Sequence, residues 1–169
     1  MPCMVSLPDG TFLIVNGAHQ GLGGSRRASS PNLNAVLYDP RQPVGSRFSI
    51  LGSTTIPRMY HSEAILLQDG RVLITGSDQG DPRFPLEYRV EVFIPPYLSS
   101  GNKQPTFTIR NTDWSYNGKY TIDVRLFQGT TANMRVSLLA GKFLCRSYNF
   151  RVVVLIFTLP CSCFEYARK

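Results

Sequence analysis

Residues 7–17 read LPDGTFLIVNG and residues 67–76 read LQDGRVLITG, and this repeated stretch decides the fold. In each copy an Asp-Gly pair precedes a short apolar run that a glycine ends, with Asp9 and Asp69 at equivalent positions. Asp-Gly beside alternating apolar residues favours a type I′ hairpin turn, in which both central residues have positive φ. The stretch therefore predicts two copies of one antiparallel unit.

Other segments around the repeat also predict strands. Each copy is followed by a loop and a second strand that ends in proline, AVLYDP at 35–40 and VEVFIPP at 90–96. Further strands are predicted at 48–53 and 61–67, and the nearly continuous apolar run of the latter is typical of a strand covered on both faces. Because we find no ten-residue window with a convincing period of 3.6, the sequence predicts an all-β protein.

Blade-like units of about 50 residues are typical of kelch-type β-propellers, and a closed seven-bladed ring needs roughly 350 residues. The 169 residues of this chain can hold about two blades and a second unit. The string PPYLSSGNKQP at 95–105 predicts a domain boundary. Alternating segments at 106–110, 119–125 and 134–139 predict the opening strands of an immunoglobulin-like β-sandwich, which normally has about seven strands.

The net charge of +7 is unevenly distributed. Residues 1–98 carry eight arginines and eight acidic residues, whereas residues 99–169 carry ten basic and three acidic residues and hold the whole excess. A nucleic-acid-binding protein would carry a basic face throughout its binding domain, so we expect no nucleic-acid partner.

We also expect no membrane partner, because the longest apolar run, Val152–Leu159, is shorter than the roughly 20 residues of a transmembrane helix. The first ten residues lack the basic and apolar regions of a signal peptide. The four cysteines form no CxxC pair. Cys161 and Cys163 could ligate a soft metal or could be free thiols, and the redox compartment stays open.

The stretch between the two repeats carries the most specific pattern. It reads IPRMYHS at 56–62 and runs directly into the second Asp-Gly repeat. With the flanking strings it closely resembles the glyoxal oxidases, which belong with galactose oxidase to the copper radical oxidases. The strings that carry the resemblance are NGAHQG (16–21), NLNAVLYDP (32–40), GSRFSILGSTTIPRMYHSEAILLQDGRVLITGSD (45–78) and EYRVEVFIPPYL (87–98).

The resemblance implies a fold and a chemistry. It implies an all-β chain with a partial kelch-type β-propeller of about two blades at 1–98, an incomplete immunoglobulin-like (early-set) β-sandwich at 99–155 and an unrelated tail at 156–169. Proteins of the family oxidise small aldehydes or alcohols with O2, give H2O2 and are secreted. Their copper is held by two tyrosines and two histidines, ligands that suit the tetragonal geometry of Cu(II). The sequence names no partner protein.

By the match of the motif, Tyr60 resembles the axial tyrosine, which acts as the catalytic base, and His61 resembles the neighbouring histidine ligand. Adjacent residues of a regular strand point to opposite faces, so both can reach one metal only from a loop or distorted turn. Pro57 favours such a turn. Taken alone, the pair would more often be a packed tyrosine beside a half-buried histidine. His19, the other histidine, is interpreted as a surface loop residue.

Two features differ from the family. The family's cross-linked cysteine–tyrosine pair lies in upstream blades, and we assign no such role to Cys3. Where the family has its last histidine ligand, this chain reads FLCRS at 143–147, and Arg146 has no lone pair for a metal. We therefore expect the chain by itself to be an inactive piece of such an oxidase. The alternatives are a non-catalytic interaction module and a degenerate gene product.

Overall fold

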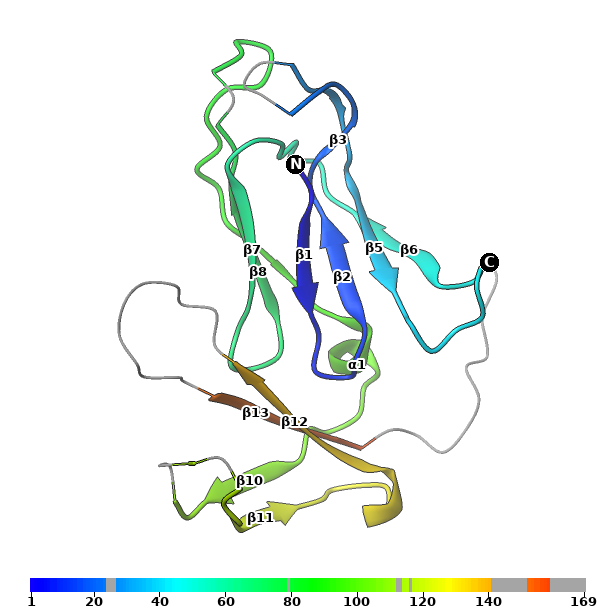
Figure 1. Cartoon of the computed structure of the whole chain (residues 1–169), viewed down its shortest axis with the longest axis vertical. Coiled ribbons are helices and arrows are strands. Elements are labelled where there is room, and N and C mark those ends of the chain that lie inside the picture. The colour runs from blue at the N-terminus through cyan, green and yellow to red at the C-terminus, as the bar shows by residue number, and fades with distance from the viewer. Residues whose placement is uncertain (24–26, 79, 112–113, 116, 141–151, 159–169) are drawn as a thin grey trace.

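The computed structural model describes residues 1–23, 27–78, 80–111, 114–115, 117–140 and 152–158. The described part is all-β and antiparallel, as predicted (Figure 1). Among these residues no helix is long and apolar enough to cross a membrane. The strands are β1 (Cys3–Ser6), β2 (Phe12–Val15), β3 (Ala18–Gln20), β4 (Ser29–Pro31), β5 (Asn34–Tyr38), β6 (Phe48–Ser53), β7 (Ser62–Leu66), β8 (Val72–Gly76), β9 (Glu91–Phe93), β10 (Thr106–Ile109), β11 (Ile122–Arg125), β12 (Met134–Ala140) and β13 (Val152–Thr158), with one short helix, α1 (Pro96–Ser99).

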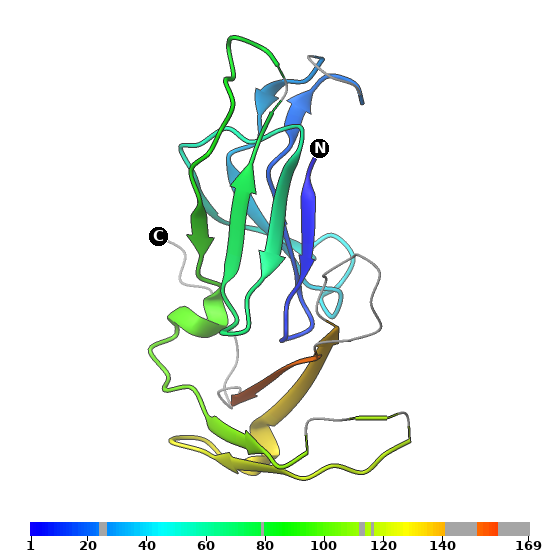
Figure 2. The ribbon, with the colours of Figure 1, turned by 90° about the vertical axis from the view of Figure 1, so that its left-hand side faces the viewer.

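Two sheets carry the two copies of the repeat. The first sheet has the order β1-β2-β5-β6, and the second has the order β7-β8-β9. The strands predicted within the two repeats are found as β2 and β8, and those predicted at 35–40, 48–53, 61–67 and 90–96 are found as β5, β6, β7 and β9. Figures 1 and 2 show the sheets side by side, with β1 of one next to β7 of the other.

The Asp-Gly hairpins differ from the predicted type I′ geometry. Positive φ occurs at Gly10 (+87°) and Gly70 (+86°), and neither preceding aspartate shares it. In both hairpins the glycine N–H donates to the carbonyl three residues earlier, that of Leu7 (3.1 Å) or Leu67 (3.0 Å). This is a three-residue loop that ends in a left-handed glycine.

The physical reason for the correction lies in the aspartate side chains, which remain outside the left-handed region and accept a local hydrogen bond. Asp9 Oδ1 accepts from the Thr11 N–H (3.0 Å), and Asp69 Oδ1 accepts from the Arg71 N–H (3.1 Å). Such aspartate-to-backbone bonds stabilise turns without positive φ at the aspartate. The two copies of the repeat therefore share the same hydrogen bond in their turns as well as the same sequence pattern.

The main core lies between the two sheets, where alternate residues of both sheets point inward. Leu13 of β2 and Val72 of β8 are fully buried there. The cluster is completed by Val5, Leu7, Val15, Ala35 and Ile74. Strand β7 is only half-buried along its length, so the predicted covering of both its faces is not found.

A row of exposed apolar residues runs along β9 and the segments on either side of it. Every second residue from Leu86 to Ile94 is a large apolar residue with at least 43% of its surface exposed. On the outer edge of the first sheet, Phe48 and Ile50 are likewise exposed. Exposed apolar rows of this kind favour self-association.

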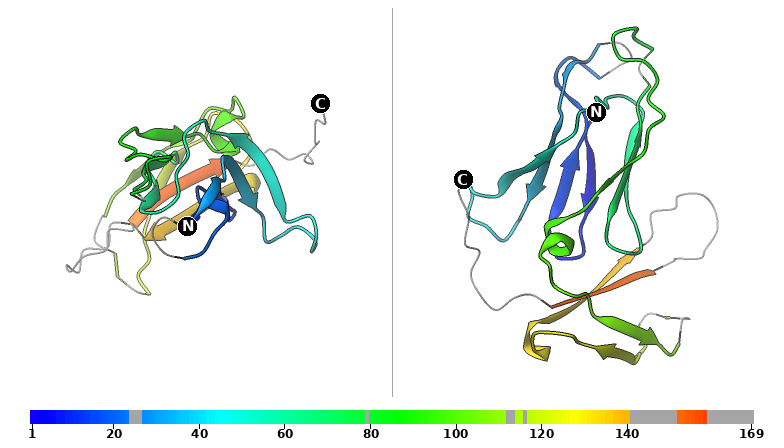
Figure 3. Two further views of the ribbon diagram at one scale, coloured as in Figure 1. Left: turned by 90° about the horizontal axis from the view of Figure 1, so that it is seen from above. Right: turned by 180° about the vertical axis from the view of Figure 1, so that it is seen from behind.

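The remaining strands form two separate ribbons, β10-β11 and β12-β13. The predicted strand group after residue 105 is therefore confirmed, and β13 includes residues 156–158 of the expected tail. Figure 3 shows α1 leading from β9 to these ribbons, which lie at the end of the sheets that carries the Asp-Gly turns. Arg146 and the cysteines at 145, 161 and 163 lie outside the described residues.

Candidate metal centre

The turn that precedes β7 carries the candidate ligands Tyr60 and His61. It lies at the end of the sheets opposite the β10–β13 ribbons, on the same side as the start of β1 (Figure 1). His61 has a φ of +56°, in the left-handed region. This φ costs a non-glycine residue about 1–2 kcal/mol, and such strain persists only where neighbouring contacts impose it. The predicted departure from regular strand geometry is therefore present at Tyr60 and His61, which are called the dyad below.

Three hydrogen bonds, made by the segments that follow β2 and β8, hold the backbone of this turn. The Gly17 N–H donates to the Arg58 carbonyl (2.8 Å), and the Asp78 N–H donates to the Tyr60 carbonyl (2.8 Å). The Met59 N–H donates to Ser77 Oγ (2.9 Å). Gly17 follows β2, and Ser77 and Asp78 follow β8. Both copies of the repeat therefore help to position the turn that lies between them.

The two candidate ligands differ in exposure. Tyr60 is 6% exposed and packs in a small cluster with Met59 and Ala28. Its hydroxyl donates to the Leu22 carbonyl at 2.6 Å, and Leu22 lies in the connection between β3 and β4. His61 is exposed. A buried tyrosine with a protected hydroxyl thus lies next to a solvent-accessible imidazole.

The residue that follows the dyad contacts Cys3. Cys3 Sγ donates to the Ser62 carbonyl (3.3 Å), and the Asn16 side-chain amide donates to Cys3 Sγ (3.6 Å). Cys3 is a free, half-buried thiol. These contacts place the Cys3 side chain beside the turn. His19 lies in β3 and is exposed.

The donor set of the dyad suits copper in kind, since phenolate oxygen and imidazole nitrogen are both ligands that Cu(II) accepts. Within the part of the chain that the structure describes, no three His, Cys, Asp or Glu side chains gather closely enough to hold a metal. Tyr60 and His61 remain the candidate ligands that the sequence motif named.

Two charged residues beside the turn were not singled out from the sequence. Arg58 is fully buried, and its Nε donates to Glu91 Oε2 at 2.9 Å. The sequence does carry a signal for both residues. Arg58 belongs to the Arg-x-Tyr-His string, and Glu91 is an acidic residue between the apolar residues Val90 and Val92. A second pair lies nearby, in which side-chain hydrogen bonds from Arg89 lower the pKa of Glu87 to about 2.

A glycine at His61 should remove the backbone strain. We expect His61→Gly to raise the free energy of unfolding by about 0.5–1 kcal/mol, because glycine adopts positive φ freely and this gain exceeds its larger unfolded-state entropy. Urea denaturation would measure the change. The control Gln68→Gly, at an exposed turn position without positive φ, should lower stability instead. A loss of stability in His61→Gly as large as in the control would contradict a strained turn.

Comparison with known proteins agrees with this arrangement. Two repeated antiparallel sheets with a Tyr-His turn between their copies define an all-β protein. Residues 1–97 match the family described as glyoxal oxidase N-terminus. The chain belongs to the glyoxal oxidase family, which confirms the resemblance seen in the sequence.

Individual relatives extend the match beyond residue 97. The chain is 59% identical over 139 residues to a WSC domain-containing protein of Arthroderma benhamiae, which is 82% of this chain and 15% of that protein. It is 38% identical over 163 residues to Aldehyde oxidase GLOX1 of Arabidopsis thaliana, covering 90% and 26%. It is 39% identical over 153 residues to Aldehyde oxidase GLOX of Vitis pseudoreticulata, covering 86% and 29%. The chain therefore spans less than a third of the length of each of these relatives.

Proposed function

We propose that this chain contributes one tyrosine and one histidine ligand of the copper centre of a glyoxal oxidase-type enzyme. The substrate would be a small aldehyde or alcohol, with O2 as oxidant and H2O2 as product. The observation that carries the proposal is the strained turn at Tyr60 and His61, where φ of His61 is +56°. The match to aldehyde oxidases over nearly the whole chain supports the same assignment.

The domain assignment belongs to the same proposal. The sheets of residues 1–98 would be two blades of a kelch-type propeller, and residues 99–155 would belong to an early-set domain. Because the relatives are much longer than this chain, the remaining ligands and the substrate-binding surface would come from other parts of such an enzyme. Secretion to the extracellular space is proposed on the family alone.

The different exposure of Tyr60 and His61 supports a separate task for each of them. The exposed His61 can present an imidazole nitrogen without rearrangement, whereas the Tyr60 hydroxyl is committed to the Leu22 carbonyl at 2.6 Å. To ligate a metal or accept a substrate proton, Tyr60 must give up both this bond and its own proton. Bound copper would supply a redox centre that accepts an electron. Metal binding through Tyr60 therefore releases a proton, and the affinity should fall as the pH is lowered.

Copper titration tests the proposal. The chain should bind Cu(II) weakly and lose it on dialysis against a chelator, because two ligands hold the metal here. Tyr60→Phe and His61→Ala should each weaken binding about tenfold or more, which corresponds to about 1.4 kcal/mol. The matched controls are Tyr88→Phe, at a side chain 80% exposed, and His19→Ala.

Competition titration with a chromophoric chelator would give these affinities. Two results would contradict the assignment: equal affinity in wild type and His61→Ala, or stoichiometric copper that survives the chelator. The second result would show that ligands beyond the dyad are present.

Turnover is a separate expectation. The copper-loaded chain should release no H2O2 above background with glyoxal, methylglyoxal or simple alcohols, because its sequence offers only two histidines and we assign a ligand role to His61 alone. A peroxidase-coupled assay would measure this. Arg146→His should not restore turnover, because the radical site would still be missing. Copper-dependent peroxide release that disappears in Tyr60→Phe would show that this expectation is wrong.

A further inference from the structure

The guanidinium of Arg58 is fully buried two residues before Tyr60, and three hydrogen bonds fix it in place. Its Nε donates to Glu91 Oε2 (2.9 Å), its Nη1 to the Gly76 carbonyl (2.6 Å) and its Nη2 to the Arg89 carbonyl (2.8 Å). A planar guanidinium presents its donors in a fixed fork, so these acceptors determine both its position and its orientation. Arg58 thereby ties the start of the turn to the end of β8 and the start of β9.

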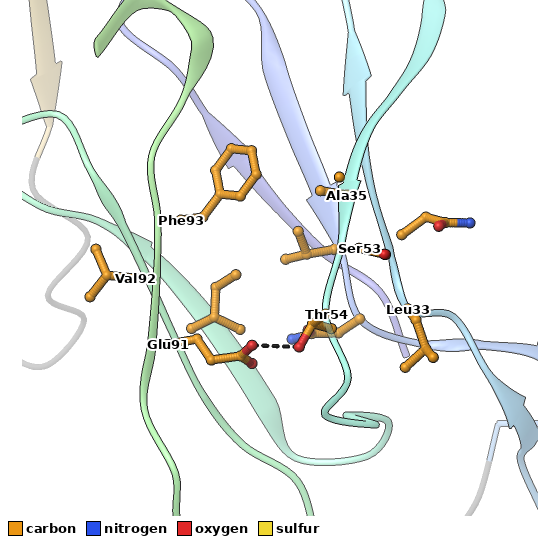
Figure 4. Close-up of a pocket in the computed structure, with 12 residues that line it drawn as sticks. Leu33, Ala35, Ser53, Thr54, Glu91, Val92 and Phe93 are labelled. Atoms are coloured by element: carbon orange, nitrogen blue, oxygen red, sulfur yellow. Dashed lines mark hydrogen bonds between the residues drawn. The ribbon is translucent and has the colours of Figure 1, made fainter. Parts of the chain in front are cut away.

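The carboxylate of Glu91 acts on the same segment a second time. Oε2 accepts from Arg58, while Oε1 accepts from the hydroxyl of Thr54. Figure 4 shows the bond to Thr54. Thr54 Oγ1 in turn accepts from the Ile56 N–H at 3.0 Å. One carboxylate on β9 therefore binds both ends of the segment from Thr54 to Arg58, which leads into the dyad.

The location of Glu91 explains why this contact is strong. It lies at one wall of a cleft between the two sheets, whose lining includes Val15, Ala35, Ile74 and Phe93 (Figure 4). The Glu91 side chain is 28% exposed, against 0% for Arg58. In a partly apolar setting, a charged hydrogen bond is stronger than in water, and an unpaired charge is correspondingly costly. The carboxylate and the guanidinium therefore hold each other in one geometry.

The strained residue lies within reach of this network. A Cβ placed on Gly76 would lie 2.7 Å from the His61 carbonyl oxygen, so the backbone that accepts the Arg58 bond also packs directly against His61. We propose that Glu91 and Arg58 are positioning residues that keep the Tyr60–His61 turn in its left-handed, ligand-presenting conformation. They do not themselves contact the metal. This inference rests on the proposed copper function of the dyad.

The test uses the full chain with Glu91→Gln, which keeps the size of the side chain and removes its charge. The matched control is Glu87→Gln, which removes the charge of a glutamate that pairs with Arg89 instead, at 2.5 Å. Thr54→Val is the second variant, because it leaves the ion pair intact and removes the Thr54 hydroxyl, with its bonds to Glu91 and to the Ile56 N–H. Far-UV circular dichroism shows which variants are folded at the temperature used.

Two readouts distinguish positioning from general stability. In the copper-free chain, the backbone NMR chemical shifts of His61 report its left-handed conformation, and we expect them to move in Glu91→Gln and Thr54→Val but not in Glu87→Gln. With Cu(II), the EPR spectrum should change in the same two variants. Affinity should fall about tenfold in Glu91→Gln and less in Thr54→Val.

Each outcome decides between the possibilities. Folded variants with lower melting temperatures but unchanged His61 shifts and copper EPR would show a purely structural ion pair and overturn the inference. A second outcome is that copper binding in the wild type depends on His61, while Glu91→Gln and Thr54→Val leave the His61 shifts, the EPR spectrum and the affinity unchanged. This result would overturn the inference and leave the proposed function intact. If His61 shifts move but wild-type copper binding does not depend on His61, the proposed function fails and no metal ligand is positioned.

Discussion

The substitution Leu13→Ala should destabilise the protein by about 2–5 kcal/mol, the range for large-to-small changes at fully buried leucines. Leu13 lies in the middle of β2 with no exposed surface, at the interface of the two sheets. Its removal leaves a cavity among residues of both copies of the repeat, and strands held by backbone bonds on both sides cannot collapse into it. Chemical denaturation monitored by circular dichroism would measure the loss.

The matched control for this change is Leu86→Ala, at a side chain that is 51% exposed. It should change the free energy of unfolding by less than about 0.5 kcal/mol, as for most surface substitutions. Equal effects at the two positions would mean that the sheets do not pack against each other in solution.

Gly76→Ala should have the second large effect, about 2–5 kcal/mol, because two costs add at this position. Gly76 has a φ of +75°, which costs alanine about 1–2 kcal/mol. Its new Cβ would also meet the His61 carbonyl at 2.7 Å, and relief of an overpacked contact costs about 1–3 kcal/mol. The variant should therefore lose stability and also disturb the dyad.

Gly101→Ala isolates the first of these costs. Gly101 has nearly the same φ, +76°, and no heavy atom lies within 4 Å of its added Cβ. We expect it to cost only the backbone term of about 1–2 kcal/mol and to leave copper binding unchanged. If Gly76→Ala were no worse than Gly101→Ala, the close approach of β8 to His61 would be disproved.

The strands could be predicted because each has a period of two and lies next to turn residues. The same reasoning gave no bounds for β1 and missed β3, β4 and the short helix α1. These elements have little apolar periodicity of their own, and contacts with distant residues stabilise them, as when Met4 of β1 pairs with Ile14 of β2. The turn type was predicted incorrectly because the sequence shows the Asp-Gly pair but does not show where the aspartate side chain finds its hydrogen bond.

The dyad could be found from its motif, and its strained conformation from the argument that neighbours in a regular strand cannot share a metal. The residues that hold the turn could not. Arg58 and Glu91 are 33 residues apart in the sequence, and their contact exists only because β8 and β9 return to the start of the turn. The Tyr60–Leu22 bond involves a backbone carbonyl, which side-chain patterns cannot predict.

The most direct test of the copper assignment is pulsed EPR of the Cu(II)-loaded chain, which detects coupling to an imidazole nitrogen. Because the sequence contains two histidines, two variants suffice to assign the signal. We expect imidazole coupling in the wild type and in His19→Ala, and its loss in His61→Ala. Coupling that persists in His61→Ala, or that disappears in His19→Ala, would contradict the assignment of His61 as the copper ligand.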